Sequence, residues 1–117
     1  MIGDRELRPW GAWHVLDEGA GYKVKSITVL PGQRLSYQTH EHRAEHWMVV
    51  AGRATCVIDG VTVHLRQGQS LDVEIGQAHR ITNMDDETLV IIEVQSGAYC
   101  GEDDICRLED DYGRVAV

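Results

Sequence analysis

Gly32 to Gly52 read GQRLSYQTHEHRAEHWMVVAG, with three histidines inside a window of seven residues. Gln38, His40 and His42 alternate with other residues, so they share one face if the chain is extended throughout, because strand side chains alternate between faces. The flanking glycines indicate turns at both ends. The stretch therefore predicts an extended segment that presents amide and imidazole groups on one side.

A second informative stretch, Gly68 to Asn83, reads GQSLDVEIGQAHRITN. Its glycine at position 76 predicts a turn just before His79. Short runs rich in Val, Ile and Thr, which favour strands, surround both stretches and cover residues 22–30, 46–51, 56–58, 61–65, 70–75 and 88–94. Asp59-Gly60 between two of these runs predicts a tight hairpin. The pattern predicts an all-β sandwich or barrel.

The two stretches resemble the paired motifs of the cupin superfamily, G-x5-H-x-H-x4-E-x6-G and G-x5-P-x-G-x2-H-x3-N. Gln38 stands where the first motif has its first histidine, and Glu74 stands where the second has proline. The resemblance implies a single-domain double-stranded β-helix, or jelly-roll barrel. It also implies a metal site, whose ligands would be Gln38, His40, Glu45 and His79.

Two imidazoles and two oxygen donors suit a borderline divalent cation. We expect Zn²⁺ first, with Mn²⁺, Fe²⁺, Co²⁺ or Ni²⁺ as alternatives. One ligand position stays open between Gln38 and His42. We prefer Gln38, because the spacing to Glu45 indicates that the strand has ended by His42.

A closer resemblance covers about Arg8 to Arg114 and carries segments such as RPWG at 8–11 and IEVQSGAYCGEDDICRLEDDYGR at 92–114. These segments are similar to the isomerase domain of type II phosphomannose isomerases. The resemblance implies a metal-dependent mannose-6-phosphate isomerase that forms fructose 6-phosphate. The nucleotidyltransferase of many relatives is not in this sequence, so synthesis of GDP-mannose is not expected. Lys25-Ser26 replaces the usual Lys-Arg, and Glu41 replaces the middle histidine of an HHH run.

Isomerisation needs a base that carries a proton between C2 and C1 of the sugar. His42, His46 and Glu93 are the candidates, although His46 should point away from Glu45 if that segment is extended. A sugar phosphate also needs positive charge, which arginine supplies in bidentate form. The candidate substrate-binding residues are Lys23, Lys25, Arg43, Arg80 and Arg107.

The 117 residues suit a single domain, 1–117, with an N-terminal arm at about 1–21, a barrel at about 22–97 and an acidic tail at about 98–117. With 19 acidic residues against 11 basic ones, the net charge of −8 argues against binding to nucleic acid or to an anionic membrane surface. Three cysteines without a CxxC spacing predict free thiols. With no signal-like segment, we expect a cytoplasmic protein.

Two other functions compete with isomerisation. The chain could be a non-catalytic or regulatory sugar-binding cupin, or another metal-dependent cupin enzyme such as an Fe²⁺ oxygenase. Cupins commonly dimerise through an open face, so we expect a homodimer. Trp10 and Trp13 offer aromatic surface for the interface, and packing in the core explains them nearly as well.

Overall fold

The computed structural model describes residues 1–114, and strands are the only regular elements there. None of these residues forms a helix long and apolar enough to cross a membrane. The strands are β1 (Arg5–Arg8), β2 (Gly11–Gly19), β3 (Tyr22–Val29), β4 (Tyr37–Thr39), β5 (Arg43–Ala51), β6 (Ala54–Ile58), β7 (Val61–Leu65), β8 (Ser70–Val73), β9 (His79–Thr82), β10 (Leu89–Gly97) and β11 (Cys106–Glu109).

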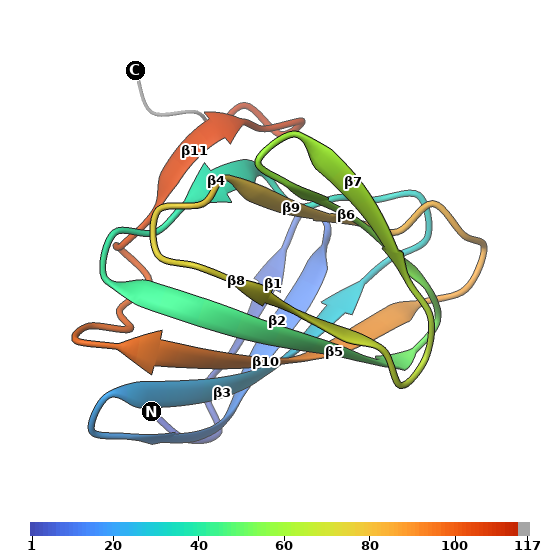
Figure 1. Cartoon of the computed structure of the whole chain (residues 1–117). Helices are drawn as coiled ribbons and strands as arrows, with labels where there is room; N and C mark the ends of the chain where they lie inside the picture. Colours follow the sequence, from blue (N-terminus) through green and yellow to red (C-terminus); the bar gives the residue numbers. More distant parts are fainter. Residues whose placement is uncertain (115–117) are drawn as a thin grey trace.

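The strands form two antiparallel sheets that face each other (Figure 1). One sheet has six strands in the order β1-β2-β3-β10-β5-β8, and the other has five in the order β11-β4-β9-β6-β7. Consecutive strands therefore often belong to opposite sheets, as in a jelly roll. The predicted all-β architecture is confirmed.

The interior of this barrel changes from apolar to polar along the strands. On β5, Glu45, Trp47 and Val49 are buried, while the residues between them are more exposed. Val49 faces Ile91 on β10, within the hydrophobic core. Two residues further along each strand, Trp47 faces Glu93, and the next inward pair is also polar. Charged side chains therefore lie inside one end of the barrel.

The hairpin between β6 and β7 confirms the turn predicted at Asp59-Gly60. Ile58 pairs with Val61, and the two residues between them have positive φ, 45° and 80°. A type I′ turn requires this conformation at both positions, which Gly adopts without strain.

The N-terminal arm expected at 1–21 is instead part of the barrel. β1 and β2 form a hairpin, and β2 pairs with β3 from Gly11–Val29 to Gly19–Tyr22. Trp10 is buried in the core, and Trp13 packs against the same cluster. The barrel therefore begins near Arg5, and the two tryptophans do not form an exposed interface.

The acidic tail expected at 98–117 also adds to the barrel wall. β11 pairs with β4 and becomes an edge strand of the five-stranded sheet. Residues 115–117 of the expected tail lie outside the described part of the chain. The barrel is thus framed by segments from both ends of the sequence.

Candidate metal centre

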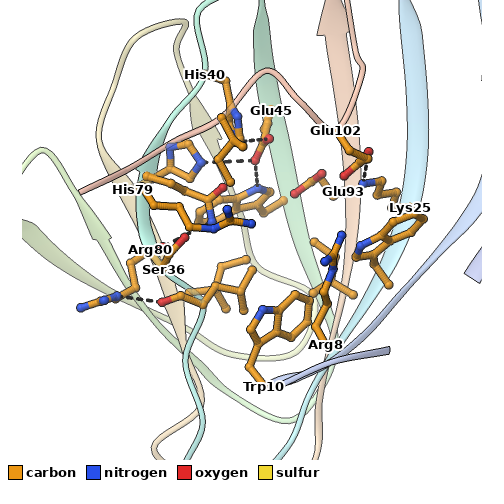
Figure 2. Close-up of a pocket in the computed structure, with 18 of the residues that line it drawn as sticks. Arg8, Trp10, Lys25, Ser36, His40, Glu45, His79, Arg80, Glu93 and Glu102 are labelled. Carbon is orange, nitrogen blue, oxygen red and sulfur yellow. Dashed lines mark hydrogen bonds and ion pairs between the residues drawn. The ribbon is translucent and has the colours of Figure 1, made fainter. Parts of the chain in front are cut away.

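Three of the four expected ligands converge inside the polar end of the barrel. Candidate ligand atoms of His40, Glu45 and His79 all lie within 4.8 Å of one another, and all three residues are buried. Nε2 of His40 is 3.2 Å from one carboxylate oxygen of Glu45, and Nε2 of His79 is 3.7 Å from the other. Figure 2 shows both rings directed at this carboxylate.

The ligands come from three strands whose register brings them together. His40 follows the last residue of β4, Glu45 lies on β5, and His79 opens β9. Gln38 on β4 is the direct partner of His79, so the two side chains project from the same face of the sheet. The spacing of these residues in the sequence therefore places their side chains together inside the barrel.

Each imidazole is oriented by its other nitrogen. Nδ1 of His40 lies 2.5 Å from the carbonyl oxygen of Asp104, and Nδ1 of His79 lies 2.9 Å from that of Gln77. A carbonyl only accepts, so each Nδ1 carries the hydrogen and each Nε2 keeps its lone pair. Metal-binding histidines are commonly held in this way.

The protonation of the two histidines also fits a metal ligand. Burial, followed by the charge of Arg43, lowers the pKa of His40 to about 4. Burial likewise lowers the pKa of His79. Both rings are therefore neutral near pH 7, the form that binds a metal ion.

Two further donors hold the Glu45 carboxylate. The indole Nε1 of Trp47 donates to one oxygen at 2.9 Å, and Nε of Arg43 donates to the other at 2.9 Å. Another nitrogen of Arg43 lies 3.2 Å from Nε2 of His40, on the lone pair that a metal ion would use. The donor set fits a divalent metal, whose binding would replace this last contact.

Gln38 is the fourth expected ligand, and it lines the same pocket. Its side chain is buried, with 9% exposed, and its amide nitrogen donates to the carbonyl of Ser36 at 3.3 Å. The amide oxygen is therefore the atom available as a ligand. His42, the alternative, is exposed and packs edge-on against Tyr99 outside this pocket.

Glu93 lies in the same pocket as a second buried carboxylate (Figure 2). Burial, with the negative charge of Glu45 as the next cause, raises its pKa to about 7. The amide nitrogen of Gln95 donates to it, and the amide oxygen of Gln95 has no hydrogen-bond partner among residues 1–114. A carboxylate with such a pKa can both take up and release a proton near neutral pH.

A family model described as "Mannose-6-phosphate isomerase C-terminal" matches residues 3–110. The chain belongs to this family. The alginate biosynthesis protein AlgA of Pseudomonas aeruginosa is 54% identical over 109 residues, which are 93% of this chain and 23% of AlgA. The mannose-1-phosphate guanylyltransferase ManC of Salmonella typhimurium is 49% identical over 108 residues, 92% of this chain and 22% of ManC. The chain thus spans less than a quarter of the length of these relatives.

A solved structure gives the same barrel. A cupin 2 conserved barrel domain protein from Salinispora arenicola superposes with a TM-score of 0.66 at 26% identity, covering 74% of this chain and 75% of that one. The predicted cupin fold and the predicted family are both confirmed.

Two of the three acid–base candidates of this cupin domain lie outside the pocket. His46 is exposed and bonds through Nδ1 to Asp72 at 2.6 Å. β5 begins at Arg43, and its alternation turns Glu45 inward and His46 outward. His42 precedes the strand, and its exposed side chain does not line the pocket. The structure therefore puts neither ring in this pocket, and Glu93 is the one of the three candidates that lines it.

The basic residues divide between the pocket and its surroundings. Lys23 does not line the pocket, and its Nζ donates to the carbonyl of Cys100 at 2.9 Å. Lys25 reaches the pocket but pairs with Glu102 at 2.5 Å. Arg80 lines the pocket and donates to the carbonyl of Leu35 at 2.9 Å.

Arg107 also lines the pocket, together with Arg114 and with Arg8, which was not among the expected phosphate-binding residues. Arg8 belongs to the RPWG segment at 8–11, which was noticed only as part of the family resemblance. β1 carries Arg8, β11 carries Arg107 and Arg114 follows β11, so segments distant in the sequence contribute to one pocket.

Proposed function

We propose that this domain is a metal-dependent sugar-phosphate isomerase that interconverts mannose 6-phosphate and fructose 6-phosphate. One observation carries the proposal: a metal-ligand cluster of His40, Glu45 and His79 shares a pocket with Glu93, a separate buried carboxylate with a pKa near neutrality. Metal ligands and an independent base in one pocket can together supply carbonyl polarisation and proton transfer, the two functions that a metal-dependent aldose–ketose isomerase needs. The choice of mannose 6-phosphate as substrate is inferred from the description of the matching family, "Mannose-6-phosphate isomerase C-terminal".

Zn²⁺ or another divalent ion held by the cluster, with Gln38 as fourth ligand, would polarise the carbonyl of the open-chain sugar. Glu93 then takes the proton from C2 and returns it to C1 of the enediol. The hydroxyl proton passes from O2 to O1, so no atom is gained or lost. His40 and His79 stay neutral and fixed throughout, because backbone carbonyls hold their Nδ1 hydrogens.

Burial supports this role for Glu93. The residue is 4% exposed, and its side chain lies between the ligand cluster and the Lys25–Glu102 pair (Figure 2). Removal from water raises the pKa of a carboxylate and limits exchange of the transferred proton with solvent.

The direct test loads the purified protein with one divalent metal at a time and follows fructose 6-phosphate formed from mannose 6-phosphate. Turnover that disappears with a chelator and returns with metal would support the proposal. Binding of the sugar phosphate without turnover under any metal would favour a sugar-binding cupin. Oxygen consumption with Fe²⁺, without isomerisation, would favour an oxygenase.

A further inference from the structure

Among the cationic side chains that line the pocket, Arg107 is the one without an anionic partner in residues 1–114. Within the part of the chain that the structure describes, it forms no ion pair, and its Nε is buried without any hydrogen-bond partner. Buried donors are almost always satisfied, and an unsatisfied one costs free energy. The unpaired Nε therefore indicates that an acceptor from outside the protein completes the site.

The remaining cations of the pocket are already engaged by the protein. The Nζ of Lys25 pairs with Glu102 at 2.5 Å, and Nε of Arg43 pairs with Glu45 at 2.9 Å. Arg80 donates to a backbone carbonyl and also lies 3.5 Å from Glu109. These side chains are held by partners within the protein, so an incoming anion would have to displace such a partner to bind them.

Arg8 and Arg114 concentrate positive charge beside Arg107. Burial, then the charge of Arg114 and, less strongly, that of Arg8, lowers the pKa of Arg107. Each neighbour has one carboxylate partner, Glu6 for Arg8 at 3.0 Å and Asp110 for Arg114 at 2.9 Å. One of the three guanidinium charges is thus left uncompensated, which favours an anion.

We propose that Arg107, assisted by Arg8 and Arg114, binds the phosphate group of a phosphate monoester whose sugar reaches the metal centre. A planar guanidinium offers paired donors that match phosphate oxygens. That the anion is the phosphate of the substrate rests on the proposed function; that an anion binds here rests on the arginines alone.

The register of the five-stranded sheet supports this placement. Arg107 on β11 pairs with Gln38 on β4, and Gln38 pairs with His79 on β9. Two strand spacings of about 4.8 Å put the backbones of Arg107 and His79 about 10 Å apart. This span suits a hexose 6-phosphate with C1 and C2 at the metal ligands and the phosphate at Arg107.

The test measures binding of inorganic phosphate, mannose 6-phosphate and uncharged mannose to the full, metal-free chain by calorimetry. R107Q removes the free charge, and R66Q is the matched control, because Arg66 is exposed and lies outside this pocket. We expect R107Q to weaken binding of mannose 6-phosphate about tenfold or more, with R66Q within about twofold of the wild type. R107K, which keeps the charge but loses the fork, should bind with intermediate affinity.

The sources of phosphate and the two proposals are separable. Tighter binding of mannose 6-phosphate than of inorganic phosphate, lost in R107Q, supports the ester site. The ester site is overturned if R107Q binds inorganic phosphate and mannose 6-phosphate with the same affinities as the wild type. It is also overturned if mannose 6-phosphate does not displace bound inorganic phosphate. Isomerisation with an unchanged KM in R107Q overturns the phosphate site and leaves the function standing. If phosphate binding depends on Arg107 but no metal supports turnover, the phosphate site stands and the isomerase function is overturned. Thermal unfolding of R107Q and R107K monitors their folding.

Discussion

Glu93 on β10 and Lys25 on β3 are directly opposite each other, yet Lys25 pairs with Glu102 instead. The Nζ of Lys25 lies 2.5 Å from Oε2 of Glu102 and 4.1 Å from the ring centre of Trp13. Glu93 is left with a hydrogen bond from Gln95 and no ion pair among the described residues. Burial therefore prevails over the nearby cations, and the pKa of Glu93 rises to about 7.

The raised pKa of Glu93 predicts a pH-dependent stability. Between about pH 4.5 and about 7 the folded, metal-free protein keeps a proton on Glu93 that the unfolded chain releases. The free energy of unfolding contributed by this group therefore falls as the pH rises through that window. In E93Q this fall should be absent. Between about pH 5 and about pH 8 the free energy of unfolding of the wild type should therefore decrease by on the order of 2–3 kcal/mol relative to that of E93Q. Urea unfolding of both proteins at about pH 5 and about pH 8, with chelator, measures the difference. If the difference in free energy of unfolding between wild type and E93Q is the same at both pH values, the raised pKa of Glu93 is contradicted.

Glu93 should also control the rate of isomerisation. E93Q keeps the size of the side chain but cannot accept the C2 proton, so kcat should fall about 100-fold or more while bound metal is retained. H46A is the control, because His46 lies on the outer face of β5, and its kcat should match the wild type. A large loss in H46A, or none in E93Q, would refute the assignment of the base.

The strand pattern and the ligand spacing were predictable because they depend on local alternation and turn chemistry. The turn at Asp59-Gly60 was predicted from its residue types and has the positive φ angles expected. The spacing between His40 and Glu45 predicted two ligands that the structure brings together. The same alternation places His46 on the outer face of β5, opposite to Glu45, as expected for an extended segment. Motif spacing preferred Gln38 to His42, and the structure puts Gln38 in the pocket.

The roles of the two chain ends were not predictable from local pattern. A register shift between Val15 and Asp17 interrupts the alternation of β2, so its pairing with β3 does not follow from a period-two pattern. Whether Trp10 is buried depends on that pairing. The placement of Arg107 depends on pairing between β4 and β11, far apart in the sequence. Which cations are free depends on ion pairs such as Lys25–Glu102, which only the folded chain reveals.

The choice between Gln38 and His42 gives a prediction of its own. Gln38 faces His79 inside the barrel, while His42 is exposed beside Tyr99. Q38A should weaken metal binding about tenfold or more, because it removes an oxygen donor, and H42A should leave it within about twofold of the wild type. Competition with a chromophoric chelator measures both affinities. The opposite ranking would make His42 the ligand.

Removal of His79 should abolish the metal centre. H79A should lower metal affinity by more than about 100-fold and should lose the rise in melting temperature that added Zn²⁺ gives the wild type. H64A is the matched control, because His64 is exposed on β7. If H79A binds and responds to Zn²⁺ as the wild type does, the ligand set is wrong.

A single titration tests the combined metal and isomerase claim. Metal-free protein receives increasing Zn²⁺, Mn²⁺ or Co²⁺, and the initial rate of fructose 6-phosphate formation from mannose 6-phosphate is measured in each sample. The account predicts that the rate rises with metal and reaches its plateau at about one ion per chain, with H79A inactive throughout. Equal rates with and without metal, or no turnover at full occupancy with any of the three ions, would contradict it.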